Sequence, residues 1–561
     1  MSGVPNRGMR VESGPAPLRG GRGRSVAALR TPTAVPLGWI LGVVLVAGFA
    51  VRWWLLWRSY LIPDADQTIV SLMARHIENG ERPVFYWGQP YTGSADAYIL
   101  ALLFRIFGEH EVLPHLAPLV ASLTWVVLTV RLAWRLYGQG IALICGALLI
   151  FPSNLLITWG TWAGSGYLEM MALGTGALLL CLPPGEGSPA AGGWRLPPAF
   201  FLLGVALWVQ PLAAAYLAAV LSLLFGRMAA AARDRSRWLG GTIQTLACAL
   251  GLIVGAAPLL IFNLQNHWAT LAFLTQRGPH MGILTVAART VAWTGPVLLG
   301  LAPATTSQPV FTQFLAGHLI LRGLALGLTV FLLGRVIVYR RQAWGRLRGV
   351  LSSQPHGDLA LLVLTLVMFA GFLTSSWGAE QWSATQPRYL LPVYTALPLI
   401  VRLALPSRIR PWRWVAAGMV AAVLCACALW VNSTAGSRQD LSSVARMLTE
   451  RGIQTVYGDY WTVIPLTYLS QERVIGVAVR DDLGDLRNNR YSPYLRAAAA
   501  ARHVAWLVQT GSARQRGVAA CFQQLHARYV VVRLGDQVLY DLIGNRAVPW
   551  WNGGLCRVEP L

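Results

Sequence analysis

The stretch YLIPDADQTIVSLMARHIENGERPVFYWGQPYTGSADAYILALLFRIFGEHE, from Tyr60 to Glu111, is the part of the chain from which fold and function are best approached. It follows the first long apolar run and holds two close carboxylates, Asp64 and Asp66, with a third at Asp96. Acidic side chains at the end of a membrane span are costly to keep there. We therefore expect this stretch to form a functional site.

Composition defines the class of protein. The chain has 561 residues, of which 55% are hydrophobic and only 12% charged. That is too little polar surface for a soluble globule of this size, and several apolar runs approach the ~20 residues of a membrane span. The formal net charge is +23, and every basic residue apart from histidine is Arg. These arginines lie in loops between apolar runs rather than along one soluble face, so we predict no nucleic-acid partner.

Charge distribution predicts the topology. Residues 1–35 are rich in Gly, Pro and Arg and have no apolar period, so they are expected to be a disordered cytoplasmic tail. Residues 36–432 are expected to be a transmembrane domain, multi-pass in the plasma membrane, with a first outer loop at 60–111. Arginine-rich loops fall on one side throughout, which supports about eleven spans and places Asp64, Asp66 and Arg388 together on the outer face. The expected spans are 35–57, 112–132, 141–157, 167–182, two short helices within 197–225 broken at Gln210 and Pro211, 242–262, 317–339, 359–373, 389–405 and 415–431.

After residue 432 the composition becomes less apolar. Residues 433–561 are expected to form a small extracytoplasmic α/β domain. The pattern predicts an amphipathic helix over 440–452 and strands near 454–457, 474–479, 503–508 and 529–534, arranged as a mostly parallel sheet. Cys521 and Cys556 could pair if this domain is outside the cell. The other five cysteines lie in apolar runs and are interpreted as packing residues.

The acids of the first outer loop suit proton transfer. A helix starting near Pro63 would place Asp66 in its first turn, where a carboxylate can act as a general base toward a hydroxyl or amine. Alternatively, Asp64 and Asp66 only cap the helix. Asp96 could orient a substrate hydroxyl or cap a helix over 97–107.

The basic and aromatic part of the loop is equally open to two interpretations. Arg75 and Arg82 could hold a lipid phosphate or anchor the chain at the membrane interface. Gln89 lies in an aromatic loop with Trp87 and is a candidate substrate contact. No CxxC motif or histidine cluster with metal-ligand spacing occurs, and we predict that neither a metal nor a cofactor is needed.

Several motifs resemble a known family. They are Asp66-Gln67 directly after the first span, LMARHIENG, and FRIFG, followed more weakly by WVQP (208–211), APLLIFNLQN (257–266) and PRYLLPVY (387–394). In this order they resemble the GT-C superfamily of polyprenyl-phosphate-sugar-dependent glycosyltransferases. The most similar group is the glycosyltransferase 39-like one, which holds protein O-mannosyltransferases and aminoarabinose transferases.

The resemblance implies an inverting sugar transfer at the outer membrane face. The donor would be a polyprenyl-phosphate sugar, the acceptor an unknown lipid, glycan or protein, and membrane lipids would be further partners. Asp66 would be the catalytic base, Arg388 a contact for the donor phosphate and Arg75 part of the same site. Gln67 replaces the second acid of the family, and Ile69 replaces a basic residue.

Two alternatives to an enzyme remain open. One is a membrane transporter or lipid-handling protein without catalysis, which would place polar groups on broken helices at mid-membrane. The other is an inactive scaffold whose outer domain recruits partners, a possibility that Gln67 keeps open.

Overall fold

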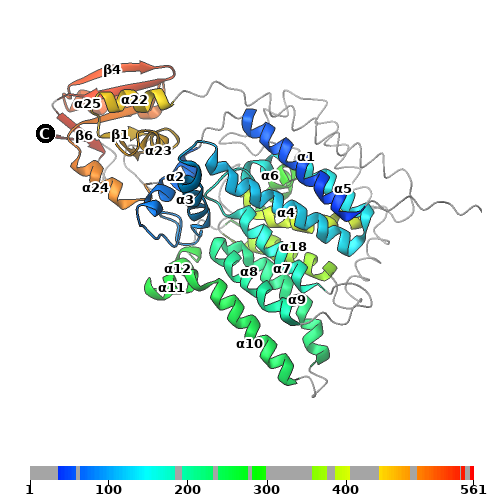
Figure 1. Ribbon diagram of the computed structural model, residues 1–561. Coiled ribbons are helices and arrows are strands. Elements are labelled where there is room, and N and C mark those ends of the chain that lie inside the picture. Colours follow the sequence, from blue (N-terminus) through cyan, green and yellow to red (C-terminus); the bar gives the residue numbers. More distant parts are fainter. Residues whose placement is uncertain are drawn as a thin grey trace, which may run out of the picture.

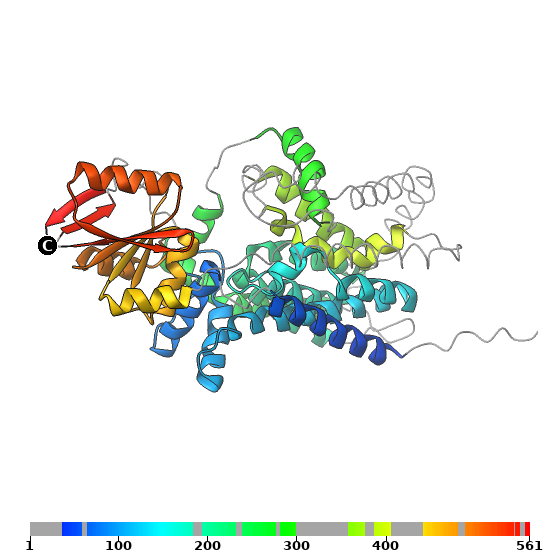
Figure 2. The same cartoon turned by 90° about the horizontal axis from the view of Figure 1, so that it is seen from above.

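The structure, a computed structural model, describes residues 36–58, 64–182, 193–231, 238–275, 281–298, 357–375, 386–404, 441–480, 489–543, 545–549 and 556–560. They form a helical part followed by a C-terminal α/β domain, which lies at one end of the helical part beside α2 and α3 (Figures 1 and 2).

The helical part contains the helices expected from the apolar runs. Its elements are α1 (Leu37–Arg58), α2 (Ala65–Glu78), α3 (Ala95–Phe107), α4 (Leu113–Tyr137), α5 (Gln139–Ile150), α6 (Asn154–Trp159), α7 (Tyr167–Cys181), η1 (Gly193–Arg195), α8 (Leu196–Val209), η2 (Pro211–Ala213), α9 (Ala214–Ala231), α10 (Trp238–Gly255), α11 (Ala257–Gln265), α12 (Ala269–Leu274), α13 (Ile283–Arg289), η4 (Thr290–Thr294), α14 (Gly295–Leu298), α18 (Gly357–Thr374), η5 (Gln386–Ala396) and α20 (Leu397–Ala404).

Some of these helices are long and apolar enough to cross a membrane. Among the described residues, α1, α4 and α18 meet that standard, and a fourth span results if α10 and α11, bent by 65° at their junction, are counted as one. The expected break at Gln210 is confirmed, because α8 ends there and η2 begins at Pro211. The spans expected at 317–339 and 415–431 lie outside the described residues. The count of eleven therefore stays a prediction.

Glycine allows the closest helix contact. A Cβ on Gly204 of α8 would lie 2.3 Å from the carbonyl oxygen of Leu252 on α10, and one on Gly255 would lie 2.2 Å from that of Phe201. Side chains at these positions would separate the two backbones. Small residues at such contacts are typical of helices that pack within a bilayer, where the hydrophobic effect does not drive association.

The C-terminal domain contains the expected helix and strands, but its sheet is mixed. Its helices are α22 (Leu441–Glu450), α23 (Tyr460–Leu469), α24 (Ser492–Ala500) and α25 (Ala513–Gln524), and its strands are β1 (Thr455–Gly458), β2 (Ile475–Ala478), β3 (Val504–Gln509), β4 (Tyr529–Leu534), β5 (Gln537–Leu542), β6 (Asn545–Pro549) and β7 (Cys556–Pro560). The main sheet has the order β2-β1-β3-β5-β4, in which β1 pairs in parallel with β2 and β3.

The expectation of a mostly parallel sheet of four strands did not include β5, β6 or β7. β5 was not predicted, and it runs antiparallel to both β3 and β4. The tight turn at Gly535, which has a φ of 62°, connects β4 directly to β5 as a hairpin. Glycine adopts this left-handed conformation at little cost. The separate β6–β7 pair is also antiparallel.

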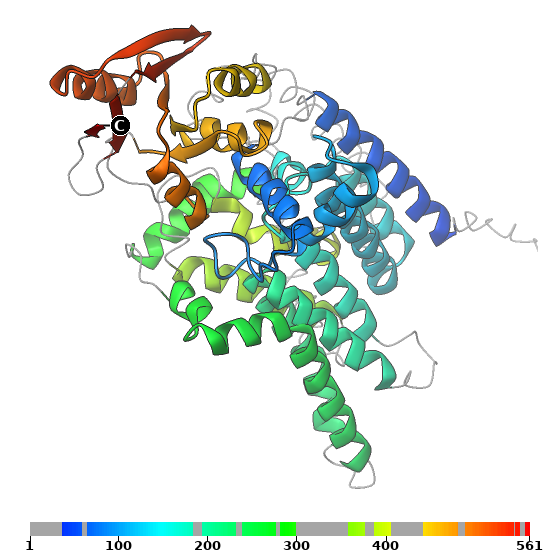
Figure 3. The ribbon, with the colours of Figure 1, turned by 60° about the vertical axis from the view of Figure 1, so that its left-hand side comes forward.

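Helix α2 lies between the two parts of the protein. It packs against α3 and α4 of the helical part and against α23 of the C-terminal domain. Figure 3 shows α2 and the loop that follows it between the C-terminal domain and the helical part. Ile69, Leu72 and Met73 of α2 belong to the same buried apolar cluster as Val463 and Leu466 of α23. Apolar burial at this contact fixes the position of the first outer loop relative to both parts.

Candidate active site

The start of α2 holds Asp66 in place. Asp64 is the N-cap residue, and its Oδ1 accepts a hydrogen bond of 2.9 Å from the backbone N–H of Gln67. The Gln67 side chain returns a bond by accepting from the backbone N–H of Asp64 at 3.1 Å, which completes a capping box. Gln67 is also fully buried beside His115. The capping interpretation therefore holds for Asp64, and it does not hold for Asp66, whose carboxylate is used elsewhere.

The Asp66 side chain faces the C-terminal domain. Its Oδ1 accepts hydrogen bonds from the Tyr460 hydroxyl at 2.6 Å and from Nη2 of Arg490 at 3.0 Å. The Asp66 side chain is 34% exposed, whereas that of Arg490 is 16% exposed. No residue in the described part of the chain donates a hydrogen bond to the second oxygen, Oδ2. One carboxylate oxygen is therefore held and the other is open.

Both donors lie at the carboxyl ends of neighbouring parallel strands. Tyr460 opens α23 directly after β1, and Asp459 caps that helix by accepting from the N–H of Trp461 at 2.9 Å. Arg490 follows β2, where the Asn489 side chain bonds to both the N–H and the carbonyl of Ala478 at 3.0 and 2.9 Å. Ligand sites of α/β sheets gather at this edge of the strands. Here the edge faces Asp66.

Aromatic rings surround Arg490. Its guanidinium carbon lies 4.9 Å from the ring centre of Tyr86 and 5.7 Å from that of Tyr460. The Tyr86 hydroxyl donates to the backbone carbonyl of Asp66 at 2.8 Å. Burial, followed by the nearby Asp66 charge, raises the pKa of Tyr460 well above its ordinary value, so Tyr460 is a neutral hydroxyl donor. Tyrosine rings therefore flank the guanidinium of Arg490, while the Asp66 carboxylate stays partly exposed.

A second arginine, Arg388, also lies among aromatic rings. The guanidinium carbon of Arg388 is 5.0 Å from the ring centres of both Trp159 and Tyr389. Tyr91 lies within the electrostatic reach of Arg388, Arg490 and Asp66, and burial raises its pKa to about 12. The association of Arg388 with the Asp66 region stays a prediction.

Asp96 makes a structural hydrogen bond to the turn before α7. It is buried in the first turn of α3, and its Oδ2 accepts from the backbone N–H of Gly164 at 2.8 Å. The α3 N-cap is Ser94, so Asp96 does not cap its own helix from that position. Burial raises the pKa of Asp96, and the backbone bonds from Gly164 and Gly166 oppose that rise. Asp96 thus fixes the turn before α7, and its contact with a substrate hydroxyl stays a prediction.

The WVQP motif attaches the first outer loop to α8. The indole N–H of Trp208 donates to the carbonyl of Val84 at 2.9 Å, and the N–H of Gly93 donates to the carbonyl of Val209 at 3.0 Å. Gln210 donates to the carbonyl of Ser165 at 2.9 Å. These bonds connect the loop that carries Tyr86 and Tyr91 to the helical part.

A second set of contacts holds the C-terminal domain on α2. His76 bonds to Glu81 at 2.9 Å through Nδ1 and to Glu472 at 3.0 Å through Nε2. Arg75 pairs with Glu109 at 2.6 Å and with Glu472 at 3.4 Å, further along α2 than Asp66. The hydrogen bond to Glu472 raises the pKa of His76, burial opposes the rise, and Glu81 adds to it.

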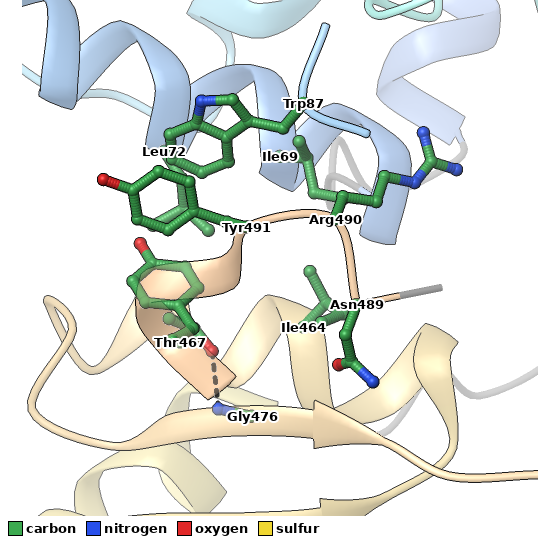
Figure 4. Close-up of a pocket in the computed structure, with 10 residues that line it drawn as sticks. Ile69, Leu72, Trp87, Ile464, Thr467, Gly476, Asn489, Arg490 and Tyr491 are labelled. Atoms are coloured by element: carbon green, nitrogen blue, oxygen red, sulfur yellow. Dashed lines mark hydrogen bonds between the residues drawn. The ribbon is translucent and has the colours of Figure 1, made fainter. Parts of the chain in front are cut away.

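An aromatic stack lies beside these ions. Trp87 stacks on Tyr491 with ring centres 3.9 Å apart. Figure 4 shows this pair above a cavity of about 20 Å³, room for one water molecule, which is lined by residues of α2 and by Thr467, Gly476 and Asn489 of the C-terminal domain. The N–H of Gly476 donates to the Thr467 hydroxyl at 2.8 Å. This part of the interface is closely packed and is suited to docking rather than to holding a sugar.

The remaining predicted contacts lie at the edge of the site. Arg82 is exposed and donates to the backbone carbonyls of Ile77 and Glu81 at 3.1 and 2.7 Å. Gln89 lies in the turn after Tyr86 and donates its backbone N–H to the carbonyl of that residue at 3.0 Å. Contacts of the substrate with Asp64, Gln67, Arg75, Arg82 and Gln89 stay predictions.

Sequence reasoning missed Tyr460 and Arg490. They lie 394 and 424 residues after Asp66, and no local pattern connects them to it. The available signal was positional: each follows a predicted strand of the C-terminal domain, at the edge where α/β sheets bind ligands. Cys521 is disulfide-bonded, as expected for an oxidising compartment, and its pairing with Cys556 stays a prediction. Within the described ranges, no three His, Cys, Asp or Glu residues are grouped to hold a metal ion.

The fold is similar to that of ArnT in two crystal structures. It matches the crystal structure of ArnT from Cupriavidus metallidurans in the apo state with a TM-score of 0.56 and 14% identity, over 90% of this chain and 98% of that one. The same enzyme bound to undecaprenyl phosphate gives a TM-score of 0.58 and 12% identity over the same shares.

A weaker structural similarity extends to the archaeal oligosaccharyltransferase AglB from Archaeoglobus fulgidus, in complex with an inhibitory peptide and a dolichol-phosphate. It is 14% identical over 84% of this chain and 69% of that one, with a TM-score of 0.46. No protein-family model matches the chain, and no curated protein matches it by sequence.

Proposed function

We propose that this protein is an inverting glycosyltransferase that moves a sugar from a polyprenyl-phosphate-linked donor to an acceptor at the outer face of the membrane. The observation that carries the proposal is the Asp66 carboxylate, which is partly exposed, held at Oδ1 and open at Oδ2. The fold supports it, because one matching structure, ArnT, is bound to undecaprenyl phosphate.

In the proposed reaction, Asp66 receives a proton from the acceptor and Arg388 stabilises the departing phosphate. The acceptor heteroatom attacks the anomeric carbon of the sugar and passes its proton to Oδ2 of Asp66. The bond between the anomeric carbon and the phosphate oxygen breaks, and its electron pair leaves on the phosphate. Arg388 stabilises that developing charge, since fixed cations act most strongly where charge appears in the transition state. A phosphate leaving group needs no metal for this step, so we predict full activity in EDTA.

The surroundings of the Arg388 side chain suit it to bind the donor phosphate. Its Nε is buried and has no hydrogen-bond partner in the described part of the chain, although Nη2 donates to the Tyr389 hydroxyl at 3.1 Å. A buried N–H donor without a partner is costly unless a ligand completes it. The phosphate of a lipid donor has the charge and the acceptor oxygens to do so.

The experiment compares two matched variants of α2. Purified protein is incubated with a panel of labelled polyprenyl-phosphate sugars, and consumption of each donor is measured. Asp66→Asn is expected to lower turnover by ~100-fold or more while folding is retained. Glu78→Gln, an exposed carboxylate at the other end of α2, is expected to behave as wild type. Transfer by Asp66→Asn at the wild-type rate would refute the assignment.

The transporter alternative predicts a different arrangement. Transporters hold their substrates at broken helices near mid-membrane. In the described residues, the polar groups around Asp66 instead gather at the junction with the C-terminal domain. Lipid movement across vesicles that is unaffected by Asp66→Asn would favour transport.

A further inference from the structure

The C-terminal domain supplies every side chain that bonds to the Asp66 carboxylate within the described residues. We infer that Tyr460 and Arg490 are positioning residues for catalysis: they hold Oδ1 of Asp66 so that Oδ2 faces the acceptor. The inference rests on the glycosyl transfer proposed above. It makes the C-terminal domain a part of the active site rather than an accessory module.

The geometry favours control of carboxylate orientation. A carboxylate can rotate about its Cβ–Cγ bond, and two donors on a single oxygen restrict that rotation. The Tyr460 bond is 2.6 Å long and the Arg490 bond 3.0 Å, both suitable for charged acceptors. A general base must be held within hydrogen-bond reach of the proton it removes, and small misplacements are expensive in rate.

The hydrogen bonding of Arg490 differs from that expected of an arginine with only a structural role. A guanidinium has five N–H donors. In the described part of the chain, this one makes a single side-chain hydrogen bond, to Asp66, although only 16% of its side chain is exposed. The bonds of Asn489 to Ala478 fix the backbone just before it. Arg490 is therefore anchored to the sheet edge while its charged end is directed to the carboxylate of Asp66, the proposed catalytic base.

The domain contact does not depend on these two residues alone. Trp87 stacks on Tyr491, and His76 bonds to Glu472, at other places on the same interface. Removing the Tyr460 hydroxyl or the Arg490 guanidinium is therefore expected to change the orientation of the Asp66 carboxylate, while the C-terminal domain stays in contact with α2. This separation allows a positioning role to be tested apart from folding.

The test measures kcat and KM of the full-length protein in lipid nanodiscs, with the labelled donor that the wild type consumes. Tyr460→Phe is expected to lower kcat by about 10-fold and Arg490→Gln by about 100-fold, with donor KM changed less than about 3-fold. Arg490→Lys should recover part of the loss, because it retains the charge but not the planar fork. Tyr468→Phe and the exposed Arg496→Gln are the matched controls and should leave both constants unchanged.

A double-mutant cycle shows whether the effect passes through the acid. In an Asp66→Asn background, Arg490→Gln should cost less than about 3-fold more, since residues that act as a unit are not additive. Independent losses that multiply would overturn the inference, as would kcat values of Tyr460→Phe and Arg490→Gln within about 2-fold of wild type. Failure of the wild type to consume any donor would instead overturn the proposed function, and the inference with it.

Discussion

Raising the pH should loosen the C-terminal domain from α2, because the charge of His76 holds the two together. Its ring nitrogens bond to Glu81 at 2.9 Å and to Glu472 at 3.0 Å. The bond to Glu472 raises the pKa of His76 above its ordinary value of about 6.5. A raised pKa means that the stabilisation is complete below about pH 6.5 and is lost as the pH rises through the folded value.

Glu472 sets the lower limit of this window. Burial raises its pKa, but the bond and charge of His76 outweigh burial, so the net pKa is lowered. Its contribution is present above about pH 4.5 and is lost only as the pH falls through the lower folded value. The interval from pH 5.5 to 8.5 therefore isolates His76.

The magnitude follows from the contacts. A hydrogen bond to a charged group contributes about 1.5–3 kcal/mol when it is well buried. The side chains of Glu81 and Glu472 are 38% and 24% exposed, so solvent screening reduces the gain. Only the bond to Glu472 joins α2 to the C-terminal domain, because Glu81 lies in the loop after α2, so about 1 kcal/mol is a reasonable total, which corresponds to about a 5-fold change in the population of the undocked state.

Hydrogen–deuterium exchange in nanodiscs measures that population. After correction for intrinsic exchange, amides of α2 and α23 are expected to exchange about 5-fold faster at pH 8.5 than at pH 5.5. His76→Gln should remove the pH dependence, whereas His110→Gln, an exposed histidine of the same loop, should retain it. Interface exchange that is equal at both pH values in the wild type would refute the reasoning.

Three further predictions concern single positions. Arg388→Gln should reduce donor turnover by about 100-fold, measured as consumption of labelled donor, with Arg388→Lys between it and wild type; equal rates would remove Arg388 from the phosphate role. Asp64→Ala should lose the α2 cap and destabilise the protein by about 1 kcal/mol, seen as a lower Tm, whereas Asp64→Asn should lose less. Gly88 has a φ of 69°, and a Cβ there would lie 3.0 Å from Cβ of Arg490, so Gly88→Ala should lower both Tm and turnover; no change in either would contradict the close approach.

Local sequence signals predicted the local structure well. A helix was expected to start near Pro63 with Asp66 in its first turn, and α2 begins at Ala65 with Asp66 in that turn. Apolar runs located the helices, and β-rich runs located four strands of the C-terminal sheet. The hairpin strand β5 was missed, because Gln537 and Asp541 interrupt its apolar pattern.

The composite nature of the site could not be predicted in the same way. Asp66 was selected by its place after an apolar run, which is a local property. Tyr460 and Arg490 reach it only because the β1–β2 edge of a distant domain packs on α2. That docking depends on tertiary contacts, such as the stack of Trp87 on Tyr491, that no spacing in the chain reveals.

The position of Asp66 between the helical part and the C-terminal domain has a consequence for protein engineering. A chimera that receives a C-terminal domain from a distant relative would keep its helices and its acid but lose the matched hydroxyl and guanidinium that contact Oδ1. Exchange of acceptor preference by domain swapping should therefore require that residues equivalent to Tyr460 and Arg490 be transplanted together with the acidic helix they serve.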